Sequence, residues 1–286
     1  MHYLTTPARS QKSISVYPET MICTPVPTII QLGGTAGLNH YMFGIGAYIQ
    51  EHYELNSGSV LLRTISGSNY VAASMLSPYS VRSIWRLWSK RLDDLATRRP
   101  WTGLWYMIRM MQHHSRQVVS TIPSARQQMH HIRIGNLSRM SNEWECSHTD
   151  DDAYLSAIHA GAFIPLICGW FWRSHRGLWC VDGGLPLPYT PRRLCDLSHA
   201  ERTINISVVD CRSLSKLQLL FSAVYGIWSR RAHHIYQYRH GYAHAKSVLR
   251  PRLDALLTRR PHRFILPEMT GELTWNISTN RFNSPD

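Results

Sequence analysis

Three short apolar segments of this chain each end in a glycine-containing turn, and this pattern limits the folds open to it. The segments are PTIIQL at 27–32, VLLRTI at 60–65 and LWCV at 178–181. Their length and β-branched residues predict buried strands. The turns GGTAG and SGSN each precede helix-like sequence, and strands that alternate with helices favour an α/β sheet.

The rest of the pattern extends this prediction over most of the chain. Further strands are expected at 131–134 and 204–209, and helices at 38–52, 70–76, 80–120, 153–160 and 213–259. We therefore expect a three-layer α/β domain over residues 26–260, with a mostly parallel sheet flanked by helices. Residues 1–25 are expected to form an extended lead-in, and residues 261–286 an irregular tail.

The composition limits the kinds of binding partner expected for this chain. The 31 basic and 18 acidic residues give a net charge of +13, which attracts anionic surfaces. Membrane and nucleic acid both qualify, and a merely solvated basic face remains an alternative. No zinc-finger or RNP-type pattern accompanies the charge, so nucleic acid is not the expected partner. Ten tryptophans favour a membrane or lipid-droplet surface instead.

Cysteines and histidines do not predict a metal site. The six cysteines form no C-x-x-C pair, so we expect reduced thiols. His240 and His244 have i, i+4 spacing, but no carboxylate or cysteine completes a ligand set. No metal or other cofactor is expected. The chain has no run of eighteen apolar residues and no secretory pattern at its start, which predicts an intracellular location, cytoplasmic or peripheral on a membrane.

Each of the three turns has a functional and a plain interpretation. GGTAG at 33–37 either cradles a phosphate, aims N–H groups at an oxyanion, or is only a tight turn. ISGSN at 65–69 has the strand–turn–helix setting of a nucleophile elbow, but departs from G-x-S-x-G. Asp182-Gly183-Gly184 places a carboxylate at the end of a strand, where it can activate a nucleophile, or forms an ordinary Asp-Gly turn.

Taken in order, the three turns resemble those of the patatin-like lipid acyl hydrolases. That family has a glycine-rich oxyanion loop, a G-x-S-x-G serine and an Asp-Gly-Gly or Asp-Gly-Ala aspartate. Three further blocks are similar to its adiponutrin and adipose triglyceride lipase branch: LNHYMFGIGAYIQEHYEL, SAIHAGAFIPLICGWFWRSHRGLWCVDGGLPLP and IYQYRHGYAHAKSVL. The resemblance covers roughly residues 27–250.

The resemblance implies a Ser–Asp dyad that attacks a lipid ester, with Asp182 as the base. An ungapped alignment of the elbow puts Gly67 at the first glycine and Asn69 at the nucleophile. A shift by one makes Ser68 the nucleophile, with Ser66 and Tyr70 in place of the glycines. The oxyanion loop would comprise Gly33, Gly34, Thr35 and Gly37.

The resemblance implies a lipid acyl-ester hydrolase that acts on a glycerolipid or phospholipid. Because an asparagine amide is not a nucleophile of this class, Asn69 at the aligned position predicts impaired catalysis or a pseudoenzyme. Activity through Ser68 remains open. The alternative from another class is a non-catalytic basic interaction protein that binds anionic membrane or nucleic acid on the same scaffold.

Overall fold

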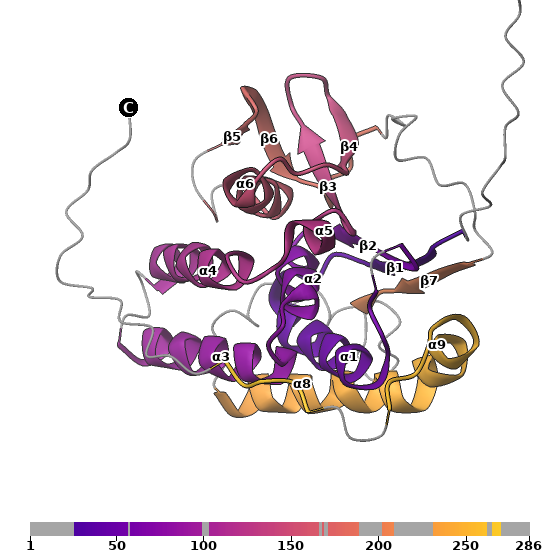
Figure 1. Ribbon diagram of the computed structural model, residues 1–286. Coiled ribbons are helices and arrows are strands. Elements are labelled where there is room, and N and C mark those ends of the chain that lie inside the picture. The colour runs from indigo at the N-terminus through magenta and orange to yellow at the C-terminus, as the bar shows by residue number, and fades with distance from the viewer. Residues whose placement is uncertain are drawn as a thin grey trace, which may run out of the picture.

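The computed structural model describes residues 26–56, 58–98, 103–165, 168, 171–188, 202–208, 231–261 and 265–269. The expected lead-in at 1–25, most of the expected tail at 261–286 and the first part of the helical region at 213–230 lie outside these residues. The described residues fold around one mixed β-sheet flanked by helices (Figure 1). This confirms the predicted α/β class, and the arrangement is compatible with a three-layer domain.

Seven strands make up the sheet within the described residues. Their order is β5-β6-β3-β2-β1-β7, and β4 also pairs with β3. The strands β7, β1, β2 and β3 run parallel, whereas β3–β4, β3–β6 and β5–β6 are antiparallel, so the sheet is only partly parallel. Their bounds are β1 Thr28–Leu32, β2 Val60–Ile65, β3 His130–Asn136, β4 Ser141–Glu145, β5 Arg173–His175, β6 Leu178–Asp182 and β7 Thr203–Ile206.

Strand β3 organises the sheet because two strands share one of its sides. The first half of β3 pairs with β2, up to the pair Ile65 and Arg133. The second half pairs with β6, beginning at Ile134 and Asp182. Since β4 pairs along Ile132 to Asn136, it occupies the other side of β3. The C-terminal ends of β2 and β6 therefore meet at neighbouring residues of β3.

The helices pack against this sheet and against one another. Helices α1 and α8 lie side by side (Figure 1), and each supplies a glycine at the crossing. A Cβ at Gly44 would collide with the carbonyl oxygen of Tyr238, and one at Gly241 would collide with that of Tyr41. The helices are α1 Asn39–His52, α2 Ser68–Leu76, α3 Val81–Arg98, α4 Gly103–Val119, α5 Ser124–Gln127, α6 Asp151–Gly161, α8 Arg231–His244 and α9 Arg250–Leu256, with a 3₁₀ turn η1 Ala36–Leu38 and a π-helical segment η4 Ala245–Leu249.

Part of the tryptophan content belongs to the core rather than to a surface. Trp85 and Trp88 of α3 are buried, and the Trp85 Nε1–H donates to His40 Nδ1 at 2.9 Å. The His40 ring also stacks on Trp88 and on His234, with centroid separations of 5.2 and 3.9 Å. No helix of the described residues is long and apolar enough to cross a membrane.

One expectation about the cysteines is wrong. Cys146 is disulfide-bonded, whereas reduced thiols were predicted; Cys168 and Cys180 are free. The spacing of cysteines along the chain shows only local pairs such as C-x-x-C. A disulfide between distant positions depends on how the fold brings two thiols together.

Candidate active site

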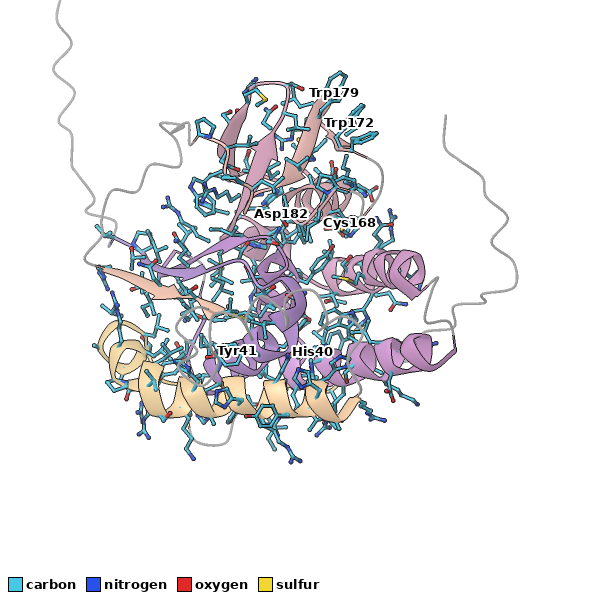
Figure 2. The ribbon with its side chains drawn as sticks, turned by 180° about the vertical axis from the view of Figure 1, so that it is seen from behind. His40, Tyr41, Cys168, Trp172, Trp179 and Asp182 are labelled. Carbon is cyan, nitrogen blue, oxygen red and sulfur yellow. The ribbon has the colours of Figure 1, made fainter. Side chains whose placement is uncertain are left out.

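Ser66 and Asp182 form the centre of the candidate site. The Ser66 hydroxyl donates a hydrogen bond of 2.5 Å to Asp182 Oδ2. Both residues are buried, and each stands at the end of its strand, where β2 and β6 meet on β3. Figure 2 shows Asp182 at the inner end of β6, near Cys168. The fold thus joins a serine hydroxyl to a buried carboxylate across the sheet.

The backbone at Ser66 has the conformation of a nucleophile elbow. Its φ is +63°, in the left-handed region that costs a non-glycine residue free energy. β2 ends at Ile65 and α2 begins at Ser68, so Ser66 occupies the sharp turn between strand and helix. This strained turn lies at the positive end of the α2 dipole, which favours negative charge there.

The residues around Ser66 differ from the G-x-S-x-G pattern. Thr64 and Ser68 occupy the two glycine places, and both are fully buried. Thr64 Oγ1 donates to Asn69 Oδ1 at 2.6 Å. Gly67, directly after the serine, has no room for a side chain, because a Cβ there would lie 2.5 Å from Thr35 Oγ1 and from Asn39 Oδ1.

Neither Ser68 nor Asn69 has the catalytic position predicted for it. Ser68 Oγ donates to the carbonyl oxygens of Leu32 and Ile65 at 3.0 and 2.8 Å, and it accepts from the Ile65 N–H. Asn69 accepts from Thr64 and donates to the Ile158 carbonyl oxygen at 3.2 Å. Both side chains hold the turn to neighbouring backbone. The serine that bonds to Asp182, Ser66, lies two residues before Ser68 and three before Asn69.

The sequence predicted Asp182 at the end of a strand, and the structure has it there, at the end of β6 beside the turn at Ser66. Its second carboxylate oxygen, Oδ1, accepts a 2.6 Å hydrogen bond from the Gly184 N–H. Burial raises the pKa of Asp182 above its ordinary value, and the hydrogen bonds from Ser66 and Gly184 act in the opposite direction. A carboxylate with a raised pKa accepts a proton more readily than an exposed aspartate does.

The glycine loop at 33–37 lies against the elbow. A Cβ at Gly34 would be 3.6 Å from Ser66 Cβ, and Gly34 itself is exposed. The Gly33 N–H is used by the Ile206 carbonyl oxygen at 2.8 Å, so it is not available to a ligand. Within the described residues, the N–H groups of Gly34 and Thr35 donate to no backbone carbonyl. Gly37 is buried inside η1 and has no described contact with Ser66.

Tyr70, Cys168 and Arg173 lie near the dyad. Burial raises the pKa of Tyr70 and of Cys168, and Asp182 raises both further, so the thiol is protonated at neutral pH. Arg173 pairs with Cys180, two residues before Asp182, and side chains at these positions share one face of the sheet. Burial lowers the pKa of Arg173, whereas Tyr70 and Cys168 raise it.

Among the described residues, no group of three or more His, Cys, Asp or Glu side chains is arranged to hold a metal ion. A cavity of about 620 Å³ lies elsewhere, at the C-terminal end of α1, and none of its lining residues belongs to the dyad.

Comparison with known proteins adds no relative. No family model, no curated protein and no solved structure matches this chain.

Proposed function

We propose that the protein is an acyl-ester hydrolase of the patatin-like type, with Ser66 as its nucleophile and Asp182 as its general base. The observation that carries this proposal is the 2.5 Å hydrogen bond from Ser66 Oγ to Asp182 Oδ2, made by a serine with φ +63° on a strand–helix turn. A hydroxyl bonded to a buried carboxylate is the minimum arrangement for activating a serine.

In the proposed reaction, Ser66 Oγ attacks the ester carbonyl carbon while its proton passes to Asp182. The tetrahedral intermediate collapses, and the departing alcohol takes that proton from Asp182. Water then attacks the acyl-serine, giving its proton to Asp182. Release of the carboxylic acid returns a proton to Ser66 Oγ, which restores both groups. The raised pKa of Asp182 suits both transfers.

The oxyanion of each intermediate would be stabilised by the glycine loop and by α2. The N–H groups of Gly34 and Thr35 are the donors we propose, since Gly33 is engaged with Ile206. The positive end of the α2 dipole adds to this stabilisation. Gly67 keeps Thr35 and Asn39 close to the elbow, because any side chain there would push this loop away.

The proposed register also strengthens the family resemblance. With Ser66 as the nucleophile, the order of glycine loop, elbow serine and Asp-Gly-Gly agrees with the patatin-like pattern without placing an asparagine at the reactive position. Thr64 and Ser68 replace the glycines but are accommodated by buried hydrogen bonds. We therefore propose an active enzyme, and the earlier reason for impairment, Asn69, does not apply.

We further propose that the substrate is a lipid ester presented at a membrane or lipid-droplet surface. The hairpin of β5 and β6 carries an exposed aromatic patch, which we define as Phe171, Trp172 and Trp179, with exposed fractions of 57%, 45% and 53%. The two indole rings stack at a centroid separation of 4.8 Å (Figure 2). Exposed aromatic clusters of this kind favour the headgroup level of a lipid surface.

The aromatic patch lies close to the dyad along β6. Trp179 and Asp182 lie on the same strand with their Cα atoms about 10 Å apart, and their side chains, three residues apart, point to opposite faces of the sheet. The net charge of +13 attracts the chain to anionic lipid. Arg139 and Arg176 beside the hairpin are ion-paired with Glu143 and Glu145, so the attraction depends on the overall charge rather than on these two.

Hydrolysis assays with two serine variants test the proposal. The purified chain would be assayed on a water-soluble short-chain ester and on phospholipid vesicles, beside Ser66→Ala and Ser68→Ala. We expect Ser66→Ala to lose the hydrolysis of both substrates and Ser68→Ala to retain it, with thermal unfolding showing that both variants are folded. Hydrolysis that survives Ser66→Ala and disappears in Ser68→Ala would refute the assignment of the nucleophile.

A further inference from the structure

A cavity of about 620 Å³ lies where the C-terminal end of α1 meets η4, α9 and residues 259–261 and 265–268. Helix α1 begins beside the elbow, at Asn39, and ends at His52, which lines the cavity. Its 14 residues place the cavity about 20 Å from the dyad. The volume suits an organic ligand rather than a bare ion.

The walls of the cavity are strongly cationic. Its lining contains five basic side chains, from Arg82, Lys246, Arg250, Arg259 and Arg260, and only two carboxylates, from Glu51 and Glu268. Behind the wall, Asp254 pairs with Arg259 at 2.5 Å and with Arg250 at 3.5 Å. After this third carboxylate is counted, basic charges still exceed acidic ones by two among these side chains.

Two ion pairs fix the shape of the cationic wall. Arg82 bonds to Glu51 at 3.0 Å, and Glu51 also accepts a 2.7 Å hydrogen bond from the Tyr242 hydroxyl. Arg259 donates to both oxygens of Asp254. These contacts hold the guanidinium groups in defined places, so a ligand that enters the cavity meets a preorganised set of donors.

Lys246 stands on an unusual piece of backbone at the cavity. It belongs to η4, the π-helical segment Ala245–Leu249 between α8 and α9. Short π-helical segments are rare and occur frequently at functional sites. Lys246 lines the cavity, and its side chain makes no ion pair or hydrogen bond with the described residues. Its ammonium is thus available to an anion.

The positive potential acts on His52, which lines the same cavity. Burial lowers the pKa of His52, Glu51 raises it, and the three cations Arg259, Arg250 and Lys246 lower it further. The lining also includes Ile265 and Leu266, which supply apolar surface, and Tyr48, which adds an aromatic ring. A ligand with a doubly charged group and a small organic part matches both the charge and the lining.

We propose that this cavity binds a phosphomonoester dianion, held by Lys246 and Arg260 together with the ordered guanidinium groups of the wall. The ligand carries an organic part against Ile265 and Leu266. This site is separate from the dyad and does not depend on the proposed hydrolase activity. The same phosphate chemistry occurs in a free sugar or glycerol phosphate and in the headgroup of phosphatidic acid.

Calorimetric titration tests this proposal with three probes: inorganic phosphate, glycerol 3-phosphate, and dihexanoyl phosphatidic acid below its micelle concentration. We expect saturable binding of at least one organic phosphate, tighter than that of inorganic phosphate. Tighter binding of glycerol phosphate identifies a soluble ligand, and tighter binding of the short-chain lipid identifies a headgroup. NMR titration of His52 would show its pKa rising when the phosphate is bound.

Single-residue variants distinguish binding at this cavity from nonspecific attraction of phosphates to a basic protein. Lys246→Ala and Arg260→Ala are expected to weaken binding about tenfold each, the loss typical of one charge-assisted contact. Lys90→Ala, an exposed lysine on α3, is the matched control and should bind as the parent does. Ser66→Ala should also bind normally. The proposal is overturned if no probe binds saturably, or if Lys246→Ala binds as tightly as the parent.

Discussion

Ser66 Oγ and Asp182 Oδ2 lie 2.5 Å apart although 116 positions separate the two residues in the sequence. They meet because Ile65 pairs with Arg133 and Asp182 pairs with Ile134, the next residue of β3. Strand β2, parallel to β3, and strand β6, antiparallel to β3, therefore end facing each other on the same side of β3. This junction supplies the geometry from which the dyad is inferred.

Asp182→Asn should abolish most hydrolysis while leaving the fold intact. Ser66 and Gly184 donate to different carboxylate oxygens, so the single amide oxygen of asparagine can keep only one of these hydrogen bonds. The amide also cannot take up a proton. We expect the rate to fall by about 10²–10⁴, the usual value of a positioned general base. Assays on a water-soluble ester, with thermal unfolding as the check on folding, would measure this. A rate within threefold of the parent would show that Asp182 is not the base.

Gly67→Ala should disrupt the elbow and its contact with the glycine loop. The added Cβ would lie 2.5 Å from Thr35 Oγ1, so the loop must move. We expect the free energy of unfolding to fall by about 1–3 kcal/mol. The hydrolysis rate should fall by more than the loss of folded protein alone explains. Gly33→Ala is the matched control, since its Cβ would approach no atom closer than 3.4 Å. Equal effects of the two substitutions in denaturant unfolding and in hydrolysis would contradict the packing described here.

The protein should lose stability in mild acid because several histidines are buried in the neutral form. Burial lowers the pKa of His40 and His130 well below 6.5, and that of His159 to about 3. The nearby His234 and His233 lower the pKa of His40 further. As pH falls below 6.5, these groups take up protons in the unfolded chain but not in the folded one, so stability decreases.

Thermal unfolding between pH 7.5 and 5 would measure this loss. We expect the midpoint temperature to fall steadily as pH falls. In His40→Gln, the number of protons taken up on unfolding should be smaller by about one. The Gln side chain keeps an acceptor for Trp85 Nε1–H. A midpoint that does not change over this range would show that these histidines titrate normally in the folded protein.

Removal of the aromatic patch should separate lipid binding from chemistry. We expect the double variant Trp172→Ala/Trp179→Ala to bind anionic phospholipid vesicles at least tenfold more weakly, because two half-exposed indoles are lost. Hydrolysis of a water-soluble ester should be unchanged. Vesicle co-sedimentation and the ester assay measure the two properties.

Tyr236→Ala provides the control for the aromatic patch, since Tyr236 is 58% exposed and lies on α8. It should bind vesicles as the parent does. Undiminished vesicle binding by the double variant would refute a role of the patch at lipid surfaces. If the parent is instead a dimer that the double variant dissociates, the patch is a self-association surface.

The sequence predicted the strands that are apolar and failed on those that are not. β1, β2 and β6 are short apolar runs bounded by turns, and the structure has them within two residues of the predicted bounds. β4 reads SNEWE and β5 has only three residues, RSH, so neither shows an apolar or alternating pattern. Without them, the antiparallel half of the sheet could not be predicted.

The aspartate of the candidate site was predictable and the serine was not. Asp182 precedes two glycines at the end of an apolar strand, which is a local signal. The elbow lacks its usual glycines, so the position of the turn had to come from where β2 stops and from the φ of Ser66. The pattern of small residues in TISGS, with Thr64 and Ser68 two places from Ser66, was the available signal.

Labelling with a fluorophosphonate probe, followed by peptide mapping, tests the central assignment most directly. The probe phosphonylates only an activated serine, and the labelled residue can be identified by mass. We predict a single label on Ser66, lost in Ser66→Ala and strongly reduced in Asp182→Asn. Ser68→Ala should still be labelled, although it is less stable by about 1–2 kcal/mol because its buried hydrogen bonds to Leu32 and Ile65 are lost. A label on Ser68, or no label on a folded parent protein, would contradict the assignment.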